Sequence, residues 1–113
     1  MKTAFSFVAL AMLLAAPPPA AAASRPTAAA PRTVTVTMDK MKFGAVPSGL
    51  RVGDRVTWIN KDMFRHTATA QDGSFNVDLP PGASATVVVR KAGAITVTCR
   101  YHPAMKTQLV IAK

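Results

Sequence analysis

Alternation of apolar and polar residues is the dominant pattern from Thr33 onward. Between Thr33 and Met38 every second residue is apolar and the others are threonines. This order gives the segment one apolar face and predicts a half-buried β-strand. Comparable segments predict strands at 55–60, 66–70, 84–90, 94–99 and 108–112, with shorter ones near 50–52 and 75–78. No segment of this region has the apolar spacing of an amphipathic helix.

Turn-forming residues separate the predicted strands at regular intervals. Glycine, proline and aspartate gather between them, at 47–49, 53–54, 72–73, 80–82 and 92–93. Seven to eight short strands with this spacing predict an all-β fold, an antiparallel Greek-key β-sandwich.

The apolar strand positions predict the core. We expect it to consist mainly of Phe43, Trp58, Ile59, Phe75, Val87, Val89, Ile95, Val97, Leu109 and Ile111. Trp58 lies in the middle of a strand beside other apolar residues, which favours a core position over a binding site. Cys99 has the same strand parity as Ile95 and Val97, so we expect its side chain to point inward at the end of that strand.

Residues 1–23 have the layout of a secretory signal peptide. Lys2 gives a positive start, an apolar run extends from 4 to 16, and small residues at Ala21 and Ala23 fit a cleavage site before Ser24. The run is shorter than the ~20 apolar residues of a membrane-spanning helix. No cysteine near the cleavage site offers a point for lipid attachment. We therefore expect export to the periplasm without a membrane anchor.

After the leader, residues 24–32 are rich in alanine and proline and predict a flexible N-terminal segment, and 33–113 predict a single domain. The formal net charge of the chain is +9. An exported protein rarely meets nucleic acid, so this surplus favours an acidic protein partner or an anionic surface. Exported domains of this size often depend on disulfides or a metal. Cys99 is the only cysteine and cannot form an internal disulfide.

The residues that carry chemistry gather near the C-terminal end. Cys99, His102 and Met105 lie within seven residues, and His66 is the only other histidine. A thiolate, two imidazoles and a thioether favour copper, because soft sulfur stabilises Cu(I) and imidazole also suits Cu(II). A single tight turn would supply three of these ligands and a neighbouring strand the fourth. Two histidines, a cysteine and a weak axial methionine describe an electron-transfer copper centre.

Other interpretations of the same residues are weaker. Taken singly, Cys99 fits a buried inert thiol, His66 a structural histidine and Met105 a core residue. Attachment of haem c needs a Cys-x-x-Cys-His motif, and the second cysteine is absent. Zinc can bind one cysteine and two histidines and can compete in solution, but a methionine ligand on a β-sandwich loop fits copper better.

The region from about Thr33 to Lys113 resembles the small blue-copper cupredoxins of the plastocyanin, pseudoazurin and amicyanin group. The shared features are the segment Val-Gly-Asp-Arg-Val-Thr-Trp at 52–58, His66-Thr67, Pro81-Gly82 and the loop 99–105. Two residues separate the histidine and methionine of the loop, as in the short loop of amicyanin. The chain departs from the group at 100–101, where Arg-Tyr replaces a small residue and proline.

The resemblance implies one copper ion that alternates between Cu(I) and Cu(II). Its equatorial ligands would be His66, Cys99 and His102, and Met105 would be the axial ligand. By the same resemblance, the backbone N–H of Thr67 would donate to the cysteine sulfur, and Asn60 would join the two ligand loops. Electrons would pass through His102, surrounded by an apolar rim of Phe64, Pro103 and Ala104.

The expected function is that of a soluble, monomeric carrier of single electrons and not of an enzyme. Both histidines are already used, so none remains to build a second, catalytic copper site. The alternative is a periplasmic copper chaperone or storage protein, which the methionines at 38, 41 and 63 favour slightly. The implied partners are redox proteins with an acidic docking surface, such as a c-type cytochrome or an amine dehydrogenase. Arg65, Arg100 and Lys106 would attract them.

Overall fold

The structure is a computed structural model that describes residues 3–4, 11, 13–14 and 30–113. The predicted cleavage site, most of the predicted leader and most of segment 24–32 lie outside the described residues. Nine strands form the fold: β1 (Thr33–Asp39), β2 (Lys42–Phe43), β3 (Leu50–Arg51), β4 (Arg55–Asn60), β5 (His66–Ala70), β6 (Asn76–Leu79), β7 (Ser84–Val88), β8 (Gly93–Thr98) and β9 (Lys106–Ala112). The described part contains no helix of the length and apolarity that a membrane crossing requires.

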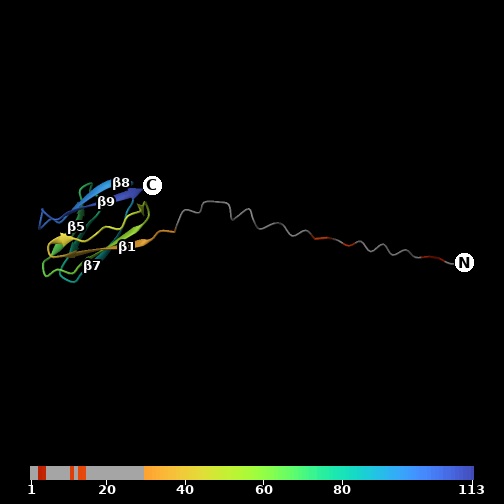
Figure 1. Ribbon diagram of the computed structural model, residues 1–113, viewed down its shortest axis with the longest axis horizontal. Coiled ribbons are helices and arrows are strands. Elements are labelled where there is room, and N and C mark those ends of the chain that lie inside the picture. The colour runs from red at the N-terminus through yellow and green to blue at the C-terminus, as the bar shows by residue number, and fades with distance from the viewer. Residues whose placement is uncertain (1–2, 5–10, 12, 15–29) are drawn as a thin grey trace.

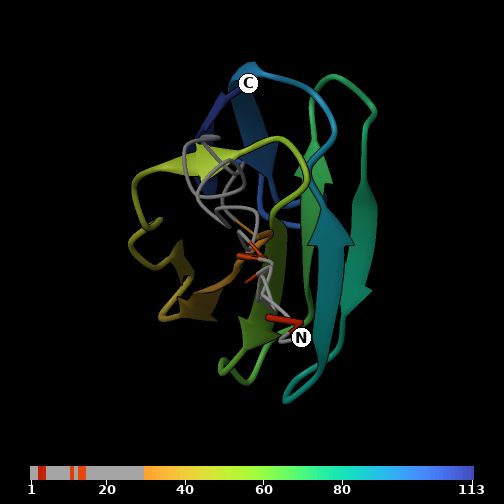
Figure 2. The same cartoon turned by 90° about the vertical axis from the view of Figure 1, so that its right-hand side faces the viewer.

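The strands form two sheets with a shared apolar core. One sheet has the order β2-β1-β4-β7 and the other β3-β9-β8-β5-β6. Figure 1 shows β1 and β7 on one side of the domain and β8 and β9 on the other, and Figure 2 gives the view at right angles. The predicted all-β sandwich is confirmed. Two of its pairings, β1 with β4 and β3 with β9, are nevertheless parallel. Both join strands that are not consecutive in the sequence, and the alternation within a strand does not reveal how such strands pair.

The core follows the alternation of the strands. In β1, Val34, Val36 and Met38 are buried while the intervening threonines face outward or are half-buried. Trp58 is fully buried, with the ring of Phe43 at 5.7 Å. Six of the expected core residues are buried, and Phe43, Phe75 and Val87 pack against the core partly buried.

Ile59 was expected in the core, and that expectation is wrong. The side chains of Trp58 and Ile59 point to opposite faces of β4, because they are neighbours in a strand. Trp58 takes the buried face, and Ile59 is only half-buried. The core also contains Leu50, Val56, Ala68 and Leu79, which the sequence pattern did not single out.

The strand pairings bring the residues of interest to one end of the domain. β8 runs antiparallel to both β5 and β9. The first residue of β5, His66, therefore lies at the same end as the last residue of β8 and the first of β9. The loop 99–105 connects β8 to β9 at this end.

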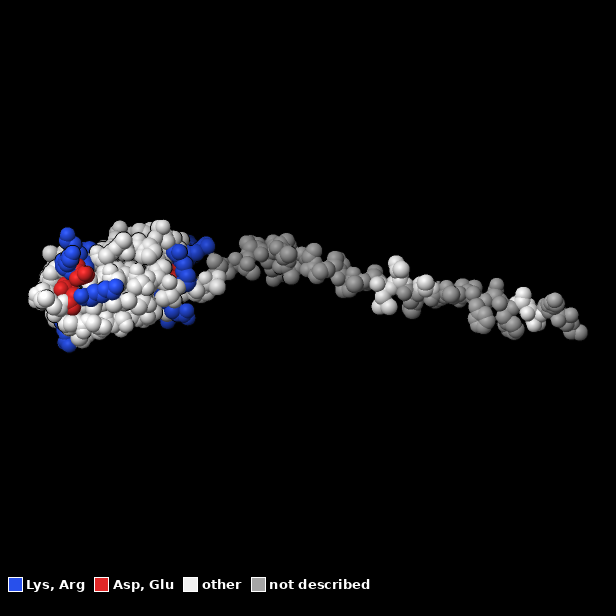
Figure 3. Space-filling view, turned by 60° about the horizontal axis from the view of Figure 1, so that its bottom comes forward, with Lys and Arg blue, Asp and Glu red and all other residues white. Residues whose placement is uncertain are grey.

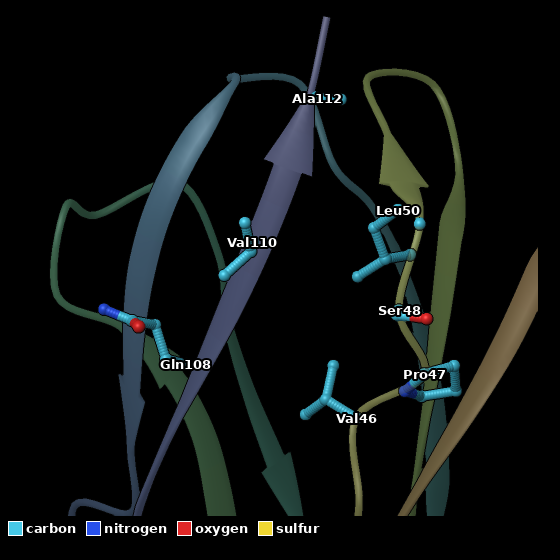
Figure 4. A pocket seen from close by; sticks show the side chains of 8 residues that line it. Val46, Pro47, Ser48, Leu50, Gln108, Val110 and Ala112 are labelled. Carbon is cyan, nitrogen blue, oxygen red and sulfur yellow. The ribbon is translucent and has the colours of Figure 1, made fainter.

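A shallow hollow of about 340 Å³ lies elsewhere, beside β9 (Figure 4). Next to it, β3 pairs with β9 at only two positions. The side chains of Val46, Leu50 and Val110 line it together with Gln108. None of the residues predicted to bind copper borders this hollow.

The register of β9 can be tested by truncating two neighbouring side chains. Leu109 is fully buried and Val110 is 66% exposed. We expect Leu109→Ala to lower the free energy of unfolding by about 2–5 kcal/mol, because it leaves a cavity in the core. Val110→Ala is the matched control and should change it by no more than about 0.5 kcal/mol. Urea unfolding followed by tryptophan fluorescence measures both, and equal losses would contradict the register.

Candidate metal centre

Three side chains, one from the start of β5 and two from the loop 99–105, converge at the end of the sandwich. The distance between His66 Nδ1 and His102 Nδ1 is 3.2 Å. Cys99 Sγ lies 3.7 Å from His66 Nδ1 and 3.6 Å from His102 Nδ1. The three atoms thus form a nearly equilateral triangle, all within 4.8 Å of one another. The structure brings together these three predicted site residues.

The loop 99–105 is held in a compact shape by its own backbone. The Met105 N–H donates to the His102 carbonyl at 2.8 Å, and the Cys99 N–H donates to the Met105 carbonyl at 3.2 Å. These bonds close the loop into a compact turn. Met105 is buried, with 4% of its surface exposed. Its role as a fourth ligand stays a prediction.

The two histidines differ in their exposure to solvent. His66 is fully buried and Cys99 is 1% exposed, whereas His102 is partly exposed. The ring of Phe64 approaches His102 edge-on at 6.3 Å. Phe64, Tyr101, Pro103 and Ala104 are exposed around it. The site therefore opens to solvent along the edge of His102.

The Cys99 sulfur receives one hydrogen bond from the backbone. The Thr67 N–H points to Cys99 Sγ at 3.4 Å, as the resemblance implied. The hydroxyl of Thr67 also accepts the N–H of Arg100 at 2.8 Å. One residue of β5 therefore holds both the cysteine and its successor.

Comparisons with known proteins identify the family of this chain. The family model of the cupredoxin-like domain matches residues 4–111. The chain belongs to this family. Solved structures of amicyanin mutants are similar to it, one in the reduced state (25% identity, TM-score 0.62), one a reduced Cu(I) form at pH 4 (25%, 0.61) and one a Cu(I) form (26%, 0.60). Each comparison covers 70% of this chain and 81% of the amicyanin chain. No curated protein matches at a significant level.

In this cupredoxin, an aspartate that the sequence analysis missed supports His66. Asp62 Oδ2 lies 2.9 Å from His66 Nε2, on the side of the ring away from Cys99. The same carboxylate accepts the backbone N–H groups of Met41 and Met63, at 3.0 and 2.8 Å. The hydrogen bond with His66 is the main cause that lowers the pKa of Asp62 below its ordinary value of 3.8, and the bond from Met41 adds to it. The spacing of four residues between the aspartate and the histidine was the only signal in the sequence.

Asn60 was expected to join the two ligand loops, but it supports only the loop before His66. Its side-chain amide donates to the carbonyls of Phe64 and Leu79, at 2.7 and 2.8 Å. Its Oδ1 accepts the N–H of Asp62 at 2.9 Å. Asn60 therefore fixes the loop before His66 to the end of β6. Its hydrogen bonds do not reach the loop 99–105.

On the face of the domain that Figure 3 shows, lysine and arginine side chains gather at both ends of the sandwich. At the end with the metal centre, Arg100 and Lys106 are exposed. Arg65 forms an ion pair with Asp78 at 3.4 Å, and both side chains are about half exposed. Arg65 is thus partly compensated, while Arg100 and Lys106 make no ion pair among the described residues.

The contact with Asp62 determines which nitrogen of His66 carries a proton. A carboxylate can only accept, so Nε2 of the neutral ring bears the hydrogen and Nδ1 keeps its lone pair. We expect long-range ¹H–¹⁵N NMR of the metal-free protein to show this tautomer. Asp62→Ala should lose it, since the acceptor is gone. Asp78→Ala removes an exposed carboxylate and should leave the spectrum of His66 unchanged, and a proton on Nδ1 in the unaltered protein would contradict the assignment.

Proposed function

We propose that this cupredoxin is an exported type 1 copper protein that carries single electrons between redox proteins. His66, Cys99 and His102 would be the strong donors to one copper ion, and Met105 would be the weak fourth donor. The observation that carries the proposal is the triangle of two imidazole nitrogens and one thiol sulfur with sides of 3.2, 3.6 and 3.7 Å. Amicyanin structures in the Cu(I) form, to which the chain is similar, support it.

The triangle has the size that a transition metal requires. Metal–nitrogen bonds of about 2.0–2.1 Å and a metal–thiolate bond of about 2.3 Å are usual in trigonal and tetrahedral sites. Donor atoms arranged trigonally at these bond lengths would lie about 3.5 Å apart for the two nitrogens and about 3.8 Å apart for nitrogen and sulfur. The distances in this chain are within about 0.3 Å of both values. The soft sulfur together with two imidazoles then favours copper over harder ions.

The protein's own contribution is to hold the ligands still. Copper supplies a one-electron couple when bound. Asp62 orients the ring of His66 through its contact with Nε2, and the N–H of Thr67 donates to the sulfur of Cys99. Such outer contacts orient the ligands and adjust their basicity. Because these groups are buried and hydrogen-bonded, the site requires little rearrangement when its charge changes.

The exposed edge of His102 is the proposed route for electrons. It is the only one of the three equatorial ligands that is not buried. Phe64, Pro103 and Ala104 give its surroundings an apolar character suited to small, short-lived contacts. The partners that we propose are redox proteins with an acidic surface, such as a c-type cytochrome or an amine dehydrogenase.

The remaining parts of the proposal concern location and state. The signal-like pattern of residues 1–23 supports export to the periplasm with cleavage near Ala23. We propose a monomeric carrier without a membrane anchor, without nucleic-acid binding and without enzymatic activity of its own. Residues 24–32 are proposed as a flexible segment ahead of the domain 33–113.

A copper chaperone or storage protein is the alternative. Met63 is 79% exposed and Met41 is 37% exposed, so both could meet a copper ion from solvent. Met38 belongs to the core and cannot. A chaperone releases its ion readily, whereas the enclosed position of His66 and Cys99 opposes exchange. An easily exchanged, colourless Cu(I) site would favour the alternative.

Adding Cu(II) to the metal-free protein tests the proposal. We expect one equivalent to produce an intense blue colour, because a thiolate ligand gives a strong charge-transfer absorption. Cys99→Ser should abolish the colour. Met105→Leu should keep it but shift the reduction potential, since the axial ligand adjusts that potential.

Tyr101→Phe is the control for the copper titration. Tyr101 is exposed and belongs to the loop 99–105, but it is not a predicted ligand. It should retain the full absorption. A protein that stays colourless, or a Cys99→Ser variant as blue as the original, would refute the copper assignment.

Salt dependence of electron transfer tests the proposed docking. The reaction with an acidic redox partner should slow as ionic strength rises, because salt screens the attraction. Arg100→Gln should make this dependence weaker. Lys113→Gln removes the same charge at the opposite end and should not change it. Stopped-flow kinetics over a range of salt concentrations measures all three proteins, and equal slopes would contradict docking at this end.

A further inference from the structure

The hydrogen-bonded ladder between β5 and β8 stops just before the metal centre. Thr69 stands opposite Thr98 in this antiparallel pairing. On the side away from the site, the Gln71 N–H donates to the Thr96 carbonyl at 2.8 Å, which marks a hydrogen-bonded pair. Such pairs recur at every second position. The next one after Thr69 and Thr98 would therefore join Thr67 to Arg100.

That pair does not form between backbone groups. The N–H of Thr67 is directed to Cys99 Sγ at 3.4 Å, and the N–H of Arg100 is directed to the hydroxyl of Thr67 at 2.8 Å. Both donors of the expected pair are thus diverted to side chains. The two strands separate at this point, which is where His66 and Cys99 face each other.

A chain of hydroxyl groups fixes the direction of these bonds. The Thr69 hydroxyl donates to Asn76 Oδ1 across β5 and β6 at 2.8 Å. Its single proton is then committed, so the Thr67 hydroxyl, 2.9 Å away, donates to Thr69. The oxygen of Thr67 is left with its lone pairs free to accept the N–H of Arg100.

We propose that Thr69 and Asn76 are positioning residues of the metal centre. Neither is a predicted ligand, and their side chains act through Thr67. By holding the Thr67 hydroxyl as an acceptor, they keep Arg100 from closing the ladder and keep the space between the strands open. The effect on copper rests on the proposed function, but the effect on Arg100 exists in the metal-free protein.

Amide hydrogen exchange of the metal-free protein tests the proposal. Thr69→Val preserves the shape of the side chain and removes the hydroxyl. We expect the Arg100 N–H to exchange about fivefold faster, the effect of losing one ordinary hydrogen bond. Asn76→Ala should act in the same direction. Asn76→Asp keeps an acceptor at this position and should restore the protection, as residue-resolved NMR can show.

Thr57→Val is the matched control. Thr57 and Thr86 form a hydroxyl pair at 2.8 Å on the other sheet, without contact to the loop 99–105. This variant should leave the exchange of Arg100 unchanged. The proposal is overturned if it accelerates that exchange as much as Thr69→Val does, or if Thr69→Val has no effect.

The reduction potential of the copper-loaded protein gives a second measurement. A loosened Thr67 donates less well to Cys99, which leaves more negative charge on the sulfur and favours Cu(II). The potential of Thr69→Val should therefore be lower than that of the unaltered protein, while that of Thr57→Val should be unchanged. Equal potentials would overturn the link to the metal centre. Failure to bind copper at all would refute the proposed function, and the exchange experiment would still decide the role of Thr69.

Discussion

The site depends on the point at which β5 and β8 cease to pair. Up to Thr69 the two strands are joined by their backbones, and this pairing within a packed sandwich fixes their separation. Beyond Thr69, the N–H of Thr67 donates to the sulfur of Cys99, and the hydroxyl of Thr67 accepts the N–H of Arg100. The strands can separate there without leaving buried polar groups unsatisfied, which would be costly. The sheet thus provides both the rigid support and the opening for a metal ion.

A second support reaches His66 from the opposite sheet. The turn between β1 and β2 places Lys40 and Met41 at φ of 53° and 60°, a conformation that costs about 1–2 kcal/mol for each residue other than glycine. In this turn the N–H of Met41 donates to Asp62, which in turn contacts His66. The unfavourable backbone is offset by a bond that ties one sheet to a predicted ligand of the other. The position of His66 therefore depends on both layers of the sandwich.

The sequence predicted the strands well because alternation is a local property. The predicted strands 55–60 and 66–70 agree with β4 and β5 to the residue. Only the two-residue β2 was missed, since it is too short to show a period. The site of His66, Cys99 and His102 could also be predicted, because these are the only cysteine and the only two histidines in the chain. Asp62, Thr69 and Asn76 were not, because their contacts arise from pairings between strands that no local pattern encodes.

The distribution of burial among the predicted ligands bears on what the site could do. Exchange of a metal requires that its ligands move or that solvent reaches them. His66 and Cys99 allow neither, since one is enclosed between Asp62 and the core and the other lies beneath Thr67. Electron transfer requires only that one ligand approach the surface, and the partly exposed ring of His102 does so. The same enclosure that would hinder the delivery of copper would allow a bound ion to change its charge without being released.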